Sequence, residues 1–313
     1  MEMEQGRRPL AVVTGGSSGI GLELARELAR RGHDLVIGGQ ETSKLVLAAA
    51  ELKEEGVEVT CVAADLTRAD EVERFYREAS AAGAIDVLCA NAGVGVGGGD
   101  FTETDLHAEL RLIDLNVRSQ VHLIKLVLPA MVARGAGHIL ITSSIAGVMP
   151  GPFEAVYAAS KAFDRHFGEA LRNEVADKGV VVTVLKPGPT DTDFFRRAGM
   201  IGTPAGDNKK DDAALVARQG IDAMFADRHH VVGGGMMNKM QTATTPLMSD
   251  PMLASVHRMQ SEPKDRKAER SSGIGAGAVA GGVLIAAAGA AAAFAFNRKR
   301  SSEREDLYRY EEA

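Results

Sequence analysis

Short, continuously apolar runs alternate with longer stretches in which apolar residues recur every three or four positions, over the first three quarters of the chain. The short runs have the length of β-strands. Because they are apolar at every position rather than at alternate ones, both faces of each strand are expected to be covered, as in a parallel sheet. The predicted strands are Leu10–Thr14, Asp34–Ile37, Val57–Ala63, Asp86–Ala90, His138–Ser143, Val180–Leu185 and His230–Val232.

The stretches between these runs have the periodicity of helices that bury one face. The predicted helices are Gly21–Arg31, Ser43–Glu55, Ala69–Ala82, Asp105–Arg134, Ala155–Lys178 and Asp211–Ala226. Strands and helices in regular alternation build right-handed β–α–β units. The pattern therefore predicts an α/β fold, a doubly wound Rossmann-type domain with a mostly parallel seven-stranded sheet.

Composition narrows the class of protein. The chain has 313 residues, of which 45% are hydrophobic and 25% charged, so it is long enough for a large core and is not a wholly disordered chain. Its formal net charge of −6 argues against a general nucleic-acid binder. Two cysteines, Cys61 and Cys89, are too few for a disulfide framework or a structural zinc site. Both lie in strand-like runs, which predicts buried free thiols in a reducing compartment, and no metal is expected.

The two ends of the chain differ in character. Residues 1–8 form a polar tail without the apolar core of a signal peptide, so we expect residues 9–262, the main domain, in the cytoplasm. A charged linker over 263–272 leads to residues 273–296, which contain no charged or polar side chain, and a charged tail follows over 297–313. As a helix, 24 residues span about 36 Å, more than the roughly 30 Å of a bilayer core. We expect a transmembrane helix that anchors the protein; a flexible Ala/Gly-rich tail is the alternative.

A glycine-rich turn follows the first predicted strand and opens the first helix, reading Thr14-Gly15-Gly16-Ser17-Ser18-Gly19-Ile20-Gly21. A sharp turn, a backbone pressed against a pyrophosphate and close packing of helix on strand each favour glycine, because a Cβ would clash. The position between strand and helix makes this a dinucleotide-binding turn rather than an ordinary loop.

Further motifs stand in a fixed order behind this turn. They are Asp65-Leu66 after the third strand, Asn91-Ala92-Gly93 after the fourth, Asn116 in the long helix, Ser144 after the fifth strand, Tyr157 and Lys161 in a YxxxK, and Pro187-Gly188 with Thr192. With the TGxxxGxG turn, they make the chain resemble the short-chain dehydrogenase/reductase family over residues 10–250. The resemblance implies an NAD(P)(H)-dependent oxidoreductase that interconverts a carbonyl and a secondary alcohol by hydride transfer.

Tyr157 and Lys161 are four residues apart on one predicted helix, so their side chains share a face. A free phenol has a pKa near 10, and a neighbouring ammonium favours the phenolate and lowers that pKa. The resemblance implies that Tyr157 is the acid/base, that Ser144 holds the substrate oxygen and that Lys161 also binds the nicotinamide ribose. It also implies that Asn116 holds a water molecule of the proton relay toward Lys161. Ser143 is the neighbouring candidate for the role of Ser144, which the spacing favours.

The cofactor-binding residues implied by the resemblance are Thr14, Gly15, Ser17, Ser18, Gly19, Ile20, Gly21, Gly39, Gln40, Asp65, Leu66, Asn91, Ala92, Gly93, Tyr157, Lys161, Pro187, Gly188 and Thr192. NAD-specific relatives place an acidic residue at the end of the second strand. Gly39 stands there in this chain, followed by Gln40 and Glu41, and Lys44 comes one helical turn later. We expect NADP(H), with NAD(H) as the alternative.

The substrate pocket is expected between the segment 144–157 and the chain after Pro187. Candidate substrate-binding residues are Ser144, Met149, Phe153, Phe194 and Phe195, joined by Met200. These side chains favour an apolar or lipid-like small molecule, although ordinary lid packing explains them equally well. A homo-oligomer is expected from the family. Two alternative functions are open: a non-catalytic cofactor-binding scaffold or sensor at the membrane, and a related epimerase or dehydratase.

Overall fold

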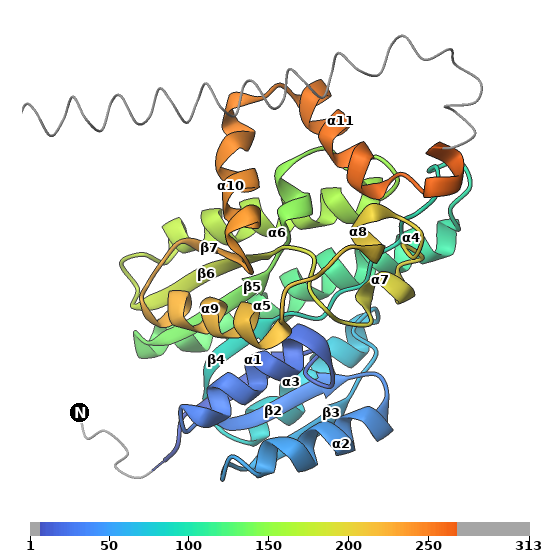
Figure 1. The fold of residues 1–313 in the computed structure, drawn as a ribbon. Helices are drawn as coiled ribbons and strands as arrows, with labels where there is room; N and C mark the ends of the chain where they lie inside the picture. The colour runs from blue at the N-terminus through green and yellow to red at the C-terminus, as the bar shows by residue number, and fades with distance from the viewer. Residues whose placement is uncertain (1–6, 268–313) are drawn as a thin grey trace, which may run out of the picture. The chain divides into compact units, whose positions relative to one another are not determined.

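The computed structural model describes residues 7–267, which form one seven-stranded sheet in which every neighbouring pair is parallel. The spatial order is β3-β2-β1-β4-β5-β6-β7 (Figure 1). The strands are β1 (Leu10–Thr14), β2 (Asp34–Gly39), β3 (Val59–Ala63), β4 (Ile85–Ala90), β5 (Gly137–Thr142), β6 (Val180–Pro187) and β7 (His230–Gly233). The predicted doubly wound sheet is confirmed.

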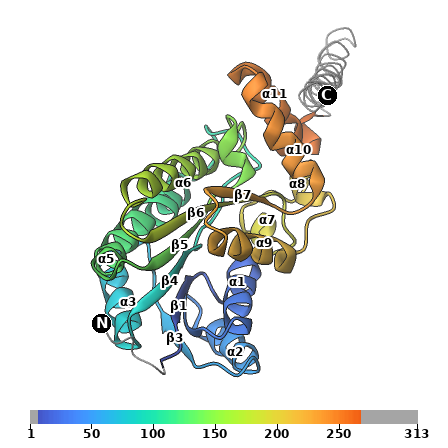
Figure 2. The same ribbon diagram turned by 90° about the vertical axis from the view of Figure 1, so that its left-hand side faces the viewer.

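Helices cover both faces of this sheet (Figure 2). One face carries α1 (Gly19–Arg30), α2 (Thr42–Lys53) and α9 (Ala213–Phe225), and the other carries α3 (Ala69–Ala81), α5 (Ser119–Arg134) and α6 (Ala155–Glu174). Each layer has its own apolar core, which explains why the strands are apolar at consecutive positions. The order of strands reverses between β1 and β4, so a crevice is expected beyond their carboxyl ends.

The predicted single helix over Asp105–Arg134 is wrong in one respect. It consists of α4 (Leu106–Ile113), a π-helical turn η1 (Asp114–Arg118) and α5. The wider turn inserts a residue without interrupting the apolar pattern, so sequence periodicity does not reveal it. The turn carries Asn116, which it directs into the interior, where the residue is fully buried.

One prediction about the cysteines needs correction. Both thiols are free, and Cys89 on the central strand β4 is buried, but Cys61 is exposed. Strand β3 is an edge strand, so its apolar run has only one neighbour in the sheet. Burial raises the pKa of the Cys89 thiol to about 12.

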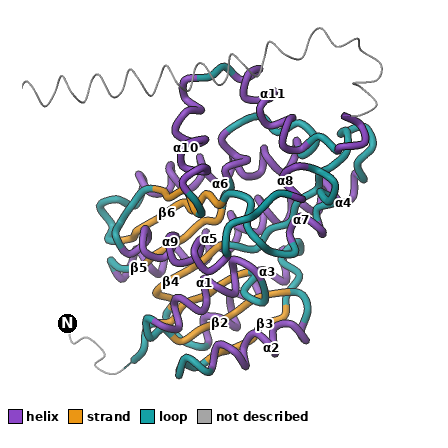
Figure 3. The backbone as a smooth tube through the Cα atoms, viewed as in Figure 1, coloured by secondary structure: helices purple, strands orange, loops and turns teal. Residues whose placement is uncertain are grey.

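Beyond β6 the chain adds two short helices, α7 (Phe194–Arg197) and α8 (Pro204–Asp207), and beyond β7 it adds α10 (Met236–Thr244) and α11 (Asp250–Ser261) (Figure 3). One compact unit reaches Lys264, and a second unit begins at Asp265, of which the structure describes only the first residues. The expected transmembrane segment 273–296 and the tail 297–313 lie outside the described residues. Among residues 7–267, no helix combines the length and apolar character needed to cross a bilayer.

Candidate active site

The glycine turn joins β1 to α1 in a conformation that requires glycine. Gly15 and Gly19 have φ angles of +68° and +56°, in the left-handed region. A Cβ on Gly21 would lie 2.1 Å from the carbonyl oxygen of Gly15, so only glycine lets the helix pack this close to the turn. Ser18 is the N-cap of α1, and its side chain makes no capping hydrogen bond, which leaves the first N–H groups of the helix to bind an anion. The turn therefore fits a dinucleotide pyrophosphate.

The end of β4 is tied to the end of β1 beside this turn. Thr14 Oγ1 accepts hydrogen bonds from the backbone N–H groups of Asn91 and Ala92, both at 3.0 Å. The amide Nδ2 of Asn91 donates to the Thr14 carbonyl oxygen at 3.1 Å. Thr14 and Asn91 therefore hold the two loops together at the point where the strand order reverses. Thr14 itself does not line the cavity described below.

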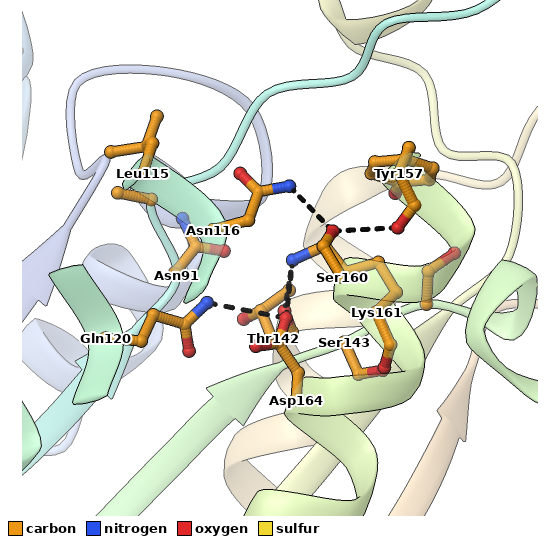
Figure 4. Close-up of polar contacts among 12 residues, drawn as sticks. Asn91, Leu115, Asn116, Gln120, Thr142, Ser143, Tyr157, Ser160, Lys161 and Asp164 are labelled. Carbon is orange, nitrogen blue, oxygen red and sulfur yellow. Dashed lines mark hydrogen bonds and ion pairs between the residues drawn. The ribbon is translucent and has the colours of Figure 1, made fainter. Parts of the chain in front are cut away.

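The π-helical turn η1 connects this loop to α6. Asn116 Oδ1 accepts from the Val94 N–H at 2.9 Å, and its Nδ2 donates to the Val94 carbonyl at 2.9 Å. Nδ2 also donates to Ser160 Oγ at 3.1 Å (Figure 4). Asn116 thus ties the segment after Asn91-Ala92-Gly93 to helix α6. Its side chain is saturated by protein partners and does not line the cavity. A role in holding a relay water stays a prediction.

Tyr157 and Ser144 meet at the start of α6. A short 3-10 helix, η2 (Ile145–Val148), begins directly after Ser144 and packs on α6, where a Cβ on Gly147 would lie 2.4 Å from the Lys161 carbonyl carbon. Burial raises the pKa of the Tyr157 phenol, the carboxylate of Glu154 adds to this, and a hydrogen bond with Ser144 opposes it. Ser143, by contrast, donates from Oγ to the Lys161 carbonyl oxygen at 2.6 Å and is buried in this contact. The geometry favours Ser144 as the serine that faces substrate.

Lys161 is buried on the same helix, with only 4% of its surface exposed. Its Nζ donates to the Thr142 carbonyl oxygen and to Asp164 Oδ2, both at 2.9 Å (Figure 4). The sequence suggested that this ammonium lowers the pKa of Tyr157. In the structure the net direction is upward, because burial of the phenol and the carboxylates of Glu154 and Asp164 outweigh the hydrogen bond with Ser144. Lys161 itself is paired with Asp164.

Most of the residues predicted from the sequence line one cavity beyond the carboxyl ends of the strands. They are Gly15, Ser17, Ser18, Gly19, Ile20, Gly21, Gly39, Gln40, Leu66, Asn91, Ala92, Gly93, Ser144, Met149, Tyr157, Lys161, Pro187, Gly188, Thr192, Phe194, Phe195 and Met200. Phe153, predicted to bind substrate, does not line it and instead lies under the Arg258 guanidinium, 4.9 Å from the ring centre. The cavity joins the glycine turn at one end to Tyr157 at the other.

Strand β2 ends in this cavity at Gly39, as the sequence predicted. Gln40 Nε2 donates to Asp65 Oδ1 at 2.7 Å, so Asp65 supports the rim of the cavity without lining it. Burial alone would raise the pKa of Asp65, but hydrogen bonds from Thr67 and Gln40 outweigh it and the net pKa is lowered. Lys44, which pairs with Glu41 at 2.7 Å, also lines the cavity. So does Arg197 of α7, a residue that the motifs did not point to.

The opposite wall comes from helices that follow the last strand. Gln241, His257, Gln260 and Ser261 line the cavity together with Glu154. His257 Nε2 hydrogen-bonds Glu154 Oε1, and Ser261 Oγ donates to the same oxygen at 3.0 Å; all three residues are buried. Sequence reasoning missed this wall, since no local motif marks it and the contacts join residues more than one hundred positions apart.

Within residues 7–267, no group of three or more His, Cys, Asp or Glu side chains is placed to bind a metal ion.

Comparisons with known proteins agree with this geometry. The sequence profile described as "short chain dehydrogenase" matches residues 9–200. The chain is 39% identical over 227 residues to 1-deoxy-11-beta-hydroxypentalenate dehydrogenase from Streptomyces exfoliatus, an alignment that covers 71% of this chain and 81% of that protein.

Two solved structures share the fold. A short-chain dehydrogenase from Sphingobium yanoikuyae in complex with NADPH superposes with a TM-score of 0.68 at 29% identity, over 77% of this chain and 96% of that one. A metagenomic short-chain oxidoreductase in complex with NADP superposes with a TM-score of 0.61 at 28% identity, over 72% of this chain and 96% of that one. With the glycine turn, Ser144, Tyr157 and Lys161 gathered around one cavity, these matches show that the chain belongs to the short-chain dehydrogenase family and is an NAD(P)-dependent oxidoreductase.

Proposed function

We propose that the enzyme interconverts a carbonyl and a secondary alcohol, with NADP(H) as the hydride carrier and Tyr157 as the acid/base. The observation that carries this proposal is the shared cavity: Ser144, Tyr157 and Lys161 line one end and the uncapped start of α1 lines the other. The glycine turn would hold the pyrophosphate of a bound dinucleotide, and the part of the same cavity beside Tyr157 would hold its nicotinamide end.

The bound cofactor supplies or accepts the hydride, and the chain supplies orientation and the proton. In reduction, Ser144 hydrogen-bonds the carbonyl oxygen and Tyr157 donates the proton that this oxygen takes up as the hydride reaches carbon. In oxidation, Tyr157 as phenolate removes the hydroxyl proton. Because the pKa of Tyr157 is raised, the phenol carries its proton at neutral pH, which is the form that reduction of a carbonyl requires.

Three features support NADP(H) over NAD(H). Gly39 leaves the end of β2 without the carboxylate that binds both ribose hydroxyls in NAD-specific sites. Lys44, at the start of α2, lines the cavity and offers positive charge to a 2′-phosphate, and Glu41, which also lines it, is paired with Lys44. Two structural neighbours are complexes with NADPH or NADP.

An apolar or lipid-like carbonyl compound fits the substrate end of the cavity. Met149, Phe194, Phe195 and Met200 line it, and Phe194 lies 5.2 Å from the Tyr157 ring, centre to centre. The wall of Glu154 and His257 adds polar groups that would orient such a substrate.

The test uses the full-length chain. Calorimetric titration with NADPH and NADH, followed by reduction assays on cyclic and long-chain ketones, should give tighter binding of NADPH and turnover that Tyr157→Phe abolishes. Tighter binding of NADH would overturn the cofactor assignment. Absence of binding by either cofactor would refute the enzymatic function, and turnover of small charged ketones alone would refute the substrate class.

The remaining proposals concern the assembly. We propose that residues 9–262 form the catalytic domain, that 263–272 link it to a membrane-anchoring segment at 273–296, and that the domain self-associates. The support for the anchor is the uncharged composition of that segment. Recovery of full-length protein from cells without detergent would contradict the anchor, and a monomeric mass in light scattering would contradict self-association.

A further inference from the structure

A buried carboxylate lies directly beside the lysine of the proposed reaction. Asp164 is fully buried, three residues after Lys161 on α6, and its Oδ2 lies 2.9 Å from Lys161 Nζ. An ammonium group has three N–H donors. Asp164 and the Thr142 carbonyl oxygen occupy two of them, so one remains for the cavity.

The surroundings of this pair are polar but incompletely satisfied. Gln120 of α5 donates from Nε2 to Asp164 Oδ2 at 3.4 Å (Figure 4). Among the described residues, Asp164 Oδ1, Gln120 Oε1 and the hydroxyl of Thr142 are buried without a hydrogen-bond partner. Burying an ion pair costs several kcal/mol of solvation per ion, and apolar residues of similar volume often stabilise a core as well or better. The Lys161–Asp164 pair, with its unsatisfied oxygens, is therefore not expected to stabilise the fold. A role in the neighbouring cavity explains its presence better.

Other charged groups also lie on or near helix α6. The carboxylates of Glu154, which His257 of α11 contacts, and of Asp164 both raise the pKa of Tyr157. Burial raises the pKa of Asp164 itself, and Lys161 and Gln120 oppose this effect. The elements packed against α6 also carry other charged or titratable groups: His107, Glu109 and Arg111 on α4, the paired Asp114 and Arg118 on η1, His138 on β5 and Lys186 on β6. Asp164 is therefore the carboxylate placed to offset the charge of Lys161.

We propose that Asp164 is a positioning residue that holds Lys161 against the Thr142 carbonyl and offsets its positive charge, so that Tyr157 stays a protonated phenol through neutral pH. The inference rests on the proposed function in taking Tyr157 as the proton donor. An ammonium alone would favour the phenolate, whereas an ammonium paired with a buried carboxylate presents little net charge. The protonated phenol is the form that reduction of a carbonyl requires.

The test is a phenolate titration of the full-length chain, which needs neither cofactor nor substrate. The sequence has four tyrosines and no tryptophan, so absorbance at about 295 nm, with Tyr157→Phe subtracted, isolates the Tyr157 signal. In Asp164→Asn we expect the Tyr157 midpoint to move to lower pH by about one unit, and the alkaline limb of the reduction rate to move with it. Asp164→Glu, which keeps the charge, should restore most of the wild-type profile.

Glu169→Gln is the matched control, because it removes one negative charge from the same helix at a different place. The Glu169 carboxylate contacts the His230 ring at 2.9 Å. It should leave the Tyr157 midpoint in place. An unchanged midpoint in a folded Asp164→Asn variant overturns the proposal. If that variant does not fold, Asp164→Ser takes its place: a Tyr157 midpoint below that of wild type supports the proposal, and an unchanged midpoint overturns it. Absence of turnover in wild type would refute the proposed function and leave the titration result standing.

Discussion

Gly39→Asp is the substitution that tests the cofactor assignment most directly. Gly39 ends β2 and lines the cavity, and a Cβ there would lie 3.1 Å from Ser17 Oγ and 3.5 Å from Leu45 Cδ2. The serine hydroxyl can rotate away, so an aspartate is accommodated. The neighbouring Gly38 offers no such room, because its Cβ would lie 2.5 Å from Phe75 Cε2.

The magnitude follows from Coulomb repulsion. Two unit charges about 6 Å apart repel by roughly 2.8 kcal/mol at an effective dielectric constant of about 20. Solvent at this half-exposed position reduces that value, so we expect NADPH affinity to fall about 10- to 100-fold, since each 1.4 kcal/mol is a factor of ten. NADH affinity should rise, because the new carboxylate accepts hydrogen bonds from both ribose hydroxyls.

Dissociation constants for both cofactors, measured by calorimetry on wild type, Gly39→Asp and Gly39→Ala, separate charge from bulk. The alanine variant adds the Cβ alone and should keep the wild-type preference. An unchanged ratio of NADPH to NADH affinity in Gly39→Asp, or an equal loss in Gly39→Ala, would refute the reasoning.

Three more outcomes are expected. Tyr157→Phe should lower kcat by about 10²- to 10⁴-fold, the usual contribution of a general acid, with NADPH affinity within twofold of wild type; retained turnover in steady-state assays would contradict its role. Gly21→Ala should abolish cofactor binding, because the added Cβ would lie 2.1 Å from the Gly15 carbonyl oxygen, and unimpaired NADPH binding in calorimetry would contradict this packing. Iodoacetamide at pH 8 should label Cys61 slowly and spare Cys89, whose pKa burial raises to about 12; mass spectrometry should find one adduct in native protein and two after denaturation, and two in the native state would be the contrary result.

The sequence by itself determined the sheet, the glycine turn and the pairing of Tyr157 with Lys161 on one helix. These features depend on neighbours along the chain: apolar runs mark buried strands, glycines mark turns that a Cβ forbids, and a spacing of four residues marks one helical face. The predicted strands start or end within two residues of those observed.

Only the tertiary structure decided the rest. The π-helical turn at Asn116, the exposure of Cys61 and the wall of Glu154, His257 and Ser261 depend on which segments pack together, and that is not encoded in local spacing. Lys161 and Asp164 are another example, although they are close in sequence. A lysine and an aspartate three residues apart on a helix usually form a solvated surface pair. Burial of this helix face between α5 and β5 instead makes it a buried ion pair on the helix that carries Tyr157.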